Sequence, residues 1–166
     1  MRNKAPGDSF HIVLVSPEIP PNTGNIGRLC VATGTPLHLV DPLGFDISDS
    51  QVKRAGLDYW QHLTLLRHKN LEQYLSKKPP EAPLVLLTKR ADRSLYDHKF
   101  EAGTHLVFGN ETSGLPDDFR NGPDRICLRI PMADDRVRSL NLSTAAGIVL
   151  YEALRQLSLK KGDQAV

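Results

Sequence analysis

The sequence has few cysteines, no long apolar run and little net charge. Cys30 and Cys127 are the only cysteines among 166 residues. Two cysteines are too few for a disulfide framework, so a reducing, cytoplasmic location is the simplest expectation. No apolar run approaches the ~18 residues that a membrane span needs. The opening stretch MRNKAPGDSF lacks the apolar core of a secretory signal. The net charge of +2 provides no overall basic field that would by itself indicate nucleic acid.

The two common phosphate-binding loops and a local metal motif are also missing. After the first apolar run a dinucleotide fold should show G-x-G-x-x-G, and SPEIPPNTGNIGR stands there instead. Gly109 and Gly114 have the glycine spacing of a P-loop, but Leu115 and Pro116 replace its Lys and Ser/Thr. The six histidines show no metal-ligand spacing along the chain, so no metal site is expected. A nucleotide-binding hydrolase is therefore disfavoured.

The apolar runs that are present predict an α/β fold. Strands are expected at 11–15, 37–40, 84–88, 105–108 and 126–130, with a weaker sixth at 63–66. Helices are expected at 24–33, 49–57 and 69–77 and at the end of the chain. Continuous rather than alternating apolar strands indicate a mostly parallel sheet with helices on both faces. We expect a single domain over 1–166, with frayed tails at 1–9 and 159–166.

The terminal helix has the clearest pattern. Its apolar residues recur at i, i+3, i+4 and i+7 from Leu142 to Leu157. Asn141 or Ser143 is expected to cap its start, because either side chain can accept hydrogen bonds from the free N–H groups of the first turn.

Three loops carry the specialised residues: 17–28, 109–116 and 130–143. Each follows a predicted strand, and open α/β sheets bind ligands at the carboxyl ends of their strands. The loops offer backbone groups, hydroxyls and amides but few charges. This composition favours a flat, polar, mostly uncharged ligand group such as adenine with ribose.

The same three loops resemble a known family. EIPPNTGNIGRLC, HLVFGNETSGLP and RIPMADDRVRSLNLSTAAGIVLYE are similar to the three motifs of the SPOUT superfamily of RNA methyltransferases, most of all to the small tRNA (cytidine/uridine-34 2′-O)-methyltransferase group. The resemblance runs from about His11 to Leu157. It implies a homodimer, a C-terminal trefoil knot, S-adenosyl-L-methionine as cofactor, and the anticodon stem-loop of tRNA as partner. The implied reaction methylates the ribose 2′-hydroxyl of the wobble nucleotide.

The resemblance also implies site residues. Those expected around the cofactor are Leu86, Thr88, Gly109, Glu111, Gly114, Ile130, Met132, Ser139 and Leu140. Those expected at the reaction are Arg28, Asn25, Glu111 and Asn141. Arg28 is better suited to gripping the target phosphate than to acting as a base, because a guanidinium keeps its proton and has no acceptor lone pair. Glu111 is expected to accept backbone N–H groups or to hold Arg28 across the dimer. For Asn25 and Asn141, helix capping alone is the alternative.

Several readings stay open. Basic clusters follow predicted strands, as at Lys89, Arg90 and Arg93, and serve either RNA or plain solvated surface. Tyr59 and Trp60 either stack on a base or form a half-buried pair. Compared with close relatives, Gly27 replaces a larger apolar residue and ADDRVRS is one residue longer. The alternatives for function are the same chemistry at another tRNA or rRNA site, and a non-catalytic RNA-binding module with this fold.

Overall fold

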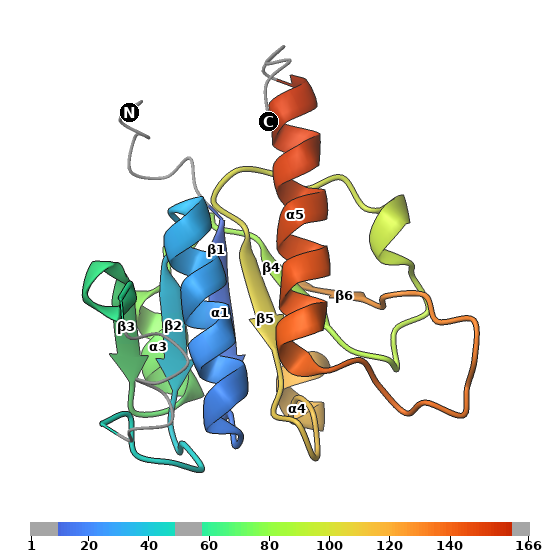
Figure 1. Cartoon of the computed structure of the whole chain (residues 1–166). Coiled ribbons are helices and arrows are strands. Elements are labelled where there is room, and N and C mark those ends of the chain that lie inside the picture. Colours follow the sequence, from blue (N-terminus) through green and yellow to red (C-terminus); the bar gives the residue numbers. More distant parts are fainter. Residues whose placement is uncertain (1–9, 49–57, 161–166) are drawn as a thin grey trace.

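The computed structural model describes residues 10–48 and 58–160. Six strands, four α-helices and two short 3-10 helices make up this part of the chain (Figure 1). In chain order they are β1 (His11–Val15), α1 (Pro20–Thr33), β2 (Leu37–Val40), η1 (Trp60–His62), β3 (Leu65–His68), α3 (Leu71–Lys77), β4 (Leu84–Leu87), η2 (Leu95–Asp97), β5 (His105–Phe108), α4 (Asp117–Arg120), β6 (Arg125–Leu128) and α5 (Leu142–Lys160).

The strands form one sheet in the order β3-β2-β1-β5-β4-β6, and every neighbouring pair is parallel. The expected parallel α/β fold is thus confirmed. From β1 the chain adds β2 and then β3 toward one edge of the sheet. The later strand β5 lies on the other side of β1. The order of strands therefore reverses between β1 and β5, and the carboxyl ends of strands at such a point are where open α/β sheets bind ligands.

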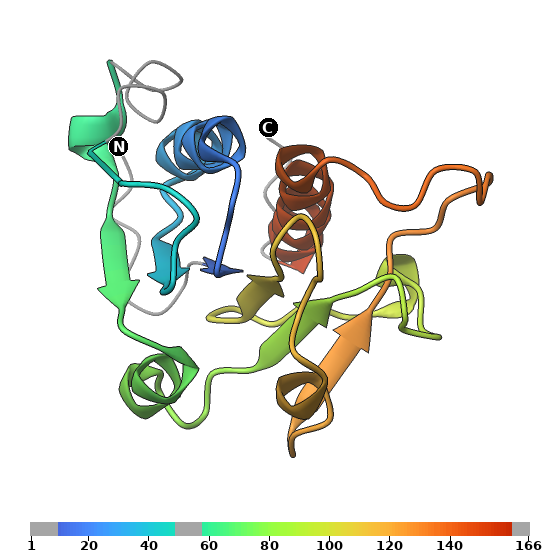
Figure 2. The same ribbon diagram turned by 90° about the horizontal axis from the view of Figure 1, so that it is seen from below.

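Helices cover both faces of the sheet (Figure 2). On one face α1 and α5 bury Ile26, Cys30 and Val149 against Ile12, Leu14 and other sheet residues. On the other face Tyr74 of α3 and Phe119 of α4 pack on Val13, Val107 and their neighbours. Because the strands are covered on both faces, their side chains are apolar at successive positions, which explains the continuous apolar runs in the sequence. None of the helices in the described ranges is long and apolar enough to cross a membrane.

The boundaries differ from expectation in a few places. The weak strand expected at 63–66 lies at Leu65–His68, because β3 is an edge strand whose central residues are exposed and which therefore lacks a continuous apolar signal. Helix α1 begins at Pro20 rather than at residue 24, since proline is well tolerated in a first helical turn, where its missing N–H would have no partner. The short helix α4 was not expected.

Other expectations fall at the edge of the description or beyond it. The helix expected at 49–57 and the tail at 1–9 lie outside the described residues. Of the tail expected at 159–166, the first two residues belong to α5, which continues to Lys160. The knot implied by the resemblance stays a prediction.

Candidate functional site

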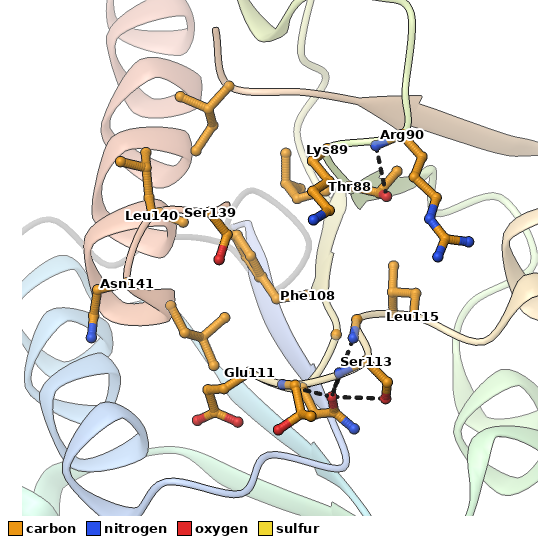
Figure 3. Close-up of a pocket in the computed structure, with 18 of the residues that line it drawn as sticks. Thr88, Lys89, Arg90, Phe108, Glu111, Ser113, Leu115, Ser139, Leu140 and Asn141 are labelled. Carbon is orange, nitrogen blue, oxygen red and sulfur yellow. Dashed lines mark hydrogen bonds between the residues drawn. The ribbon is translucent and has the colours of Figure 1, made fainter. Parts of the chain in front are cut away.

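A cavity of about 560 Å³ lies at the carboxyl ends of β4, β5 and β6 (Figure 3). This volume is within the range of about 300–1,000 Å³ that small-molecule sites occupy. Segments 87–90, 108–115 and 130–142 supply most of its wall. The apolar part of the wall consists of Ile19, Leu87, Phe108, Leu115, Ile130, Met132, Leu140, Leu142 and Ala145. Apolar side chains between backbone-rich loops suit a planar base with polar edges, which is the environment that the adenosine of S-adenosylmethionine requires.

The loop after β5 is held in shape by Asn110. Its side-chain oxygen accepts hydrogen bonds from the backbone N–H groups of Thr112 (3.1 Å), Ser113 (2.7 Å) and Gly114 (3.2 Å). Gly114 has φ +72°, and a Cβ on Gly109 would lie 2.1 Å from the Gly114 carbonyl carbon. Gly114 therefore permits a positive φ, and Gly109 permits a close approach between two backbone segments. Together they make this cavity wall compact and preformed.

Glu111 joins this loop to the start of α1. Its carboxylate accepts hydrogen bonds from the backbone N–H groups of Glu18 (2.8 Å) and Ile19 (3.1 Å) and from Asn22 Nδ2 (3.2 Å). Ile19, at the N-cap position, has no capping side chain of its own. Pro20 and Pro21, the first two helical residues, have no N–H, so the carboxylate pairs with the N–H groups just before the helix. An anionic acceptor is favourable there because the helix N-terminus carries partial positive charge.

Asn141 joins the third loop to the same network. Its Oδ1 caps α5 by accepting from Ser143 N (2.9 Å), while its Nδ2 donates to Asn22 Oδ1 (3.0 Å). Asn22 thus bridges Glu111 and Asn141, and hydrogen bonds among three side chains fix the three loops relative to one another.

Asn22 is a residue that sequence reasoning missed. It is only 5% exposed and lines the cavity, whereas Asn25, chosen from the same motif, is exposed and does not line it. Two asparagines three positions apart lie about a turn apart on a helix. The sequence signal that could have identified Asn22 is its position in the first turn of the helix, where a buried amide can donate to one neighbouring loop and accept from another.

Arg28 lies outside the cavity, exposed on α1. Its guanidinium carbon is 4.9 Å from the ring centroid of Tyr59, a cation–π distance, and the Tyr59 hydroxyl donates to Gly24 O (3.2 Å). Arg28 therefore covers one face of the Tyr59 ring, which is then not free to stack on an RNA base. Glu111 serves backbone N–H groups within its own chain, the first of the two roles expected for it.

Of the remaining expected cofactor residues, Thr88, Ile130, Met132, Ser139 and Leu140 line the cavity. Residues 131–139 are all exposed. Met132 and Ser139 therefore line the cavity from a loop that is open to solvent. Leu86 does not line the cavity. It is 0% exposed in the core with Tyr74, one residue before the wall begins at Leu87.

The cavity also has a cationic side that the expected residues did not include. Lys89, Arg90 and Arg120 line it, and Arg90 and Arg120 both pair with the Asp117 carboxylate. The hydrogen bond and the charge of Arg120 lower the pKa of Asp117, and Arg90 adds to this effect. This side can attract a carboxylate or a phosphate.

Comparison with known proteins agrees with the geometry. The chain is 43% identical over 155 residues to the tRNA (cytidine(34)-2'-O)-methyltransferase of Burkholderia cenocepacia (strain HI2424), covering 92% of this chain and 99% of that one. A solved structure described as giving structural insights into the 2-OH methylation of C/U34 on tRNA matches with a TM-score of 0.87 and 44% identity, over 92% of this chain and 99% of the other. The SpoU methyltransferase AviRb from Streptomyces viridochromogenes, solved with the cofactor AdoMet, matches with a TM-score of 0.83 and 28% identity, over 93% and 60%.

The sequence model of the SpoU rRNA Methylase family matches residues 9–151. The earlier resemblance is confirmed by this match, by the relatives and by a cavity at the predicted edge of the sheet: the chain belongs to the SpoU methylase family of methyltransferases.

Proposed function

We propose that this chain is an S-adenosylmethionine-dependent tRNA methyltransferase that modifies the ribose 2′-hydroxyl of nucleotide 34, acting as one domain in the cytoplasm. The observation that carries the proposal is the Glu111–Asn22–Asn141 network, which ties the cavity loops to the first turn of α1. Arg28 is on that same helix. The arrangement fixes a residue suited to RNA relative to a cavity suited to the cofactor.

When bound, the cofactor supplies a methyl group activated by the neighbouring sulfonium. The apolar wall and the backbone of 109–114 would hold its adenosine, and Lys89, Arg90 or Arg120 would pair with its carboxylate. This chain's further task is to bring the 2′-hydroxyl oxygen in line with the methyl carbon, because positioning accounts for much of the rate in such transfers.

Arg28 is suited to the substrate side of the reaction. Its guanidinium keeps its proton and presents planar paired donors, so it grips a phosphate of the target nucleotide and stabilises negative charge that develops on the 2′ oxygen. The stacking contact with Tyr59 limits the orientations of the guanidinium before RNA binds. The hydroxyl proton passes to solvent from this exposed face of α1.

We further propose that the active form is a homodimer. Arg28 lies outside the cavity of its own chain, and a second copy would enlarge the surface available to an anticodon stem-loop. Light scattering at micromolar concentration and physiological salt should give twice the chain mass, and a monomer mass would contradict the dimer.

The function is tested by transfer of labelled methyl from S-adenosylmethionine into total tRNA from cells that lack this protein, followed by mapping of the labelled nucleotide. Label at the ribose of nucleotide 34 is the expected result. Label at another tRNA position would keep the enzyme class and overturn the choice of nucleotide 34, and label in ribosomal RNA, offered in a parallel reaction, would do the same. Absence of transfer to both RNAs, with cofactor binding intact by calorimetry, would support a non-catalytic RNA-binding module.

A further inference from the structure

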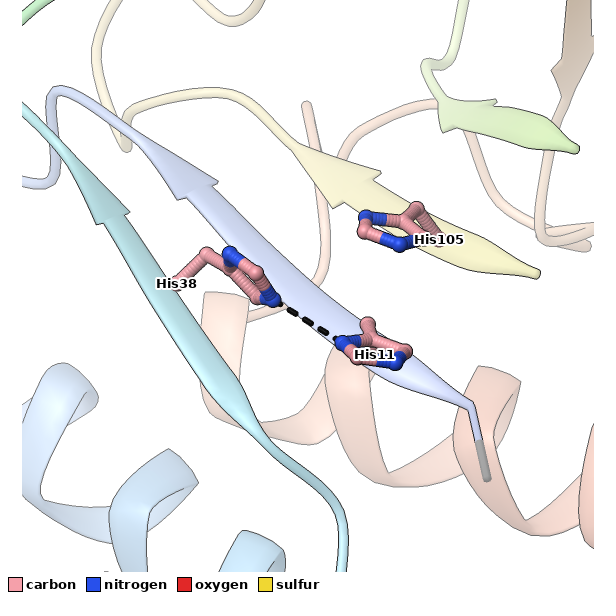
Figure 4. A group of neighbouring side chains, drawn as sticks. All are labelled: His11, His38 and His105. Atoms are coloured by element: carbon pink, nitrogen blue, oxygen red, sulfur yellow. Dashed lines mark hydrogen bonds between the residues drawn. The ribbon is translucent and has the colours of Figure 1, made fainter. Parts of the chain in front are cut away.

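Three histidines distant in sequence meet at the other end of the sheet. His11 and His105 are the first residues of β1 and β5 and are register partners, and His38 is the second residue of β2 (Figure 4). One ring nitrogen from each lies within 4.8 Å of one from each of the others. Their strands run from this edge toward the cavity, so the cluster is remote from the proposed active site.

The cluster is buried and two of its rings are oriented from behind. His38 is 6% and His105 is 2% exposed, while His11 is half-buried and opens the cluster to solvent. His38 Nδ1 is 2.9 Å from His68 Nε2, and His105 Nδ1 is 2.8 Å from the Tyr74 hydroxyl. Such outer hydrogen bonds hold the ring nitrogens of metal-binding histidines and leave the opposite nitrogen of each ring for the ion.

We propose that His11, His38 and His105 form a binding site for one divalent transition-metal ion of the zinc class. Neutral imidazole is a preferred ligand for Zn²⁺, Co²⁺, Ni²⁺ and Cu²⁺. His11 Nδ1 and His38 Nε2, now 2.9 Å apart, share one proton. The ion takes the place of that proton, which moves to the other nitrogen of its ring, so each imidazole stays neutral with its one proton on the nitrogen that faces away from the ion.

Two features shape the site. The rings of His11 and His105 are stacked, with centroids 4.3 Å apart, so binding requires one of them to tilt, and the half-buried His11 has the room. The nearby charges are cationic, since Lys77 acts on His68 and Lys78 on His105. The fourth ligand is therefore a solvent anion such as hydroxide or chloride, which offsets part of the charge of the ion. Because the site lies away from the cavity, we assign the ion a role in stabilising the fold rather than in methyl transfer.

The test uses untagged full-length protein stripped with a chelator and titrated with Zn²⁺ against a chromophoric competitor. One ion per chain is expected. His11→Asn and His105→Asn should each weaken binding at least about tenfold, and Tyr74→Phe, which removes only the hydroxyl behind His105, by about tenfold. The exposed His62→Asn is the matched control and should bind like wild type. Each variant is first shown to be folded by its unchanged affinity for S-adenosylmethionine at the opposite edge.

Co²⁺ gives a second readout. Wild type should show the intense visible bands of a four-coordinate site, and His11→Asn should lose them. Absence of stoichiometric binding to wild type would overturn the site. Equal binding by wild type and His11→Asn would do so as well, since the ion would then lie elsewhere on the surface.

Discussion

At the scale of single residues, Glu111 combines loop order with helix capping. Replacing it with Gln swaps one carboxylate oxygen for an NH₂ group that faces a backbone donor, so one of the two backbone bonds is lost. We expect Glu111→Gln to lower the free energy of unfolding by about 1–2 kcal/mol. We also expect weaker cofactor binding, because the same loop forms the cavity wall. Urea denaturation and calorimetry measure the two effects.

Glu101→Gln is the matched control for this prediction. Glu101 is exposed and does not line the cavity, so its variant should leave cofactor affinity unchanged. Equal losses in both variants would mean that a general charge effect, rather than the cap of α1, is responsible.

Variants of Arg28 and Tyr59 can separate effects on tRNA binding and methyl transfer from effects on cofactor binding. Arg28→Ala should abolish methyl transfer while cofactor affinity stays within a few-fold, because Arg28 lies outside the cavity. Tyr59→Leu should raise the KM for tRNA, whereas Tyr59→Phe retains the ring face and should keep most activity. Steady-state kinetics with tRNA and calorimetry with cofactor distinguish these outcomes. Loss of cofactor binding in Arg28→Ala would contradict the role on RNA.

At the scale of elements, α1 and η1 fit each other through Gly27. A Cβ at this position would lie 2.8 Å from Trp60 Cζ3, so Trp60 occupies the space that a larger side chain would fill. In an open helix Gly→Ala stabilises by roughly 1 kcal/mol, and here the clash should cancel or reverse that gain. Gly27→Ala in a Trp60→Leu background should recover it.

A double-mutant cycle of unfolding free energies checks this packing. A coupling between Gly27 and Trp60 of at least about 0.5 kcal/mol is expected for residues in contact. Additive effects would show that η1 moves away from α1 without cost.

The elements also show what the sequence could predict. Continuous apolar runs located β1, β2 and β5 to the residue, because these strands are buried on both faces. It misplaced the edge strand β3, whose middle residues face solvent. The three loops were recognised from their motifs, but the choice between Asn22 and Asn25 required three-dimensional placement. The histidine cluster had no local signal because its members come from three strands.

At the scale of the whole molecule, the buried histidines link folding to pH. Burial, with His11 and His68 adding to the effect, lowers the pKa of His38 to about 3. Burial and neighbouring charges lower that of His105 to about 2. Both rings are therefore neutral in the folded chain at pH 5, whereas in the unfolded chain each takes up a proton near its ordinary pKa of about 6.5. The unfolded state binds more protons below that pH, so acid favours unfolding.

The stability that these two histidines contribute is fully present above about pH 6.5 and decreases as the pH falls toward their folded-state pKa values. At pH 5 the expected loss is about 2 kcal/mol for each ring, on the order of 4 kcal/mol together. Urea unfolding at pH 5, 6, 7 and 8 in the presence of a chelator measures the loss without bound metal. His62→Asn, at an exposed position, should keep the wild-type pH dependence, and His38→Asn should flatten it between pH 6.5 and 5. A wild-type free energy that is flat from pH 8 to pH 5 would show that the imidazoles take up protons without unfolding, and the buried hydrogen-bonded cluster would then have to open to solvent in the native state.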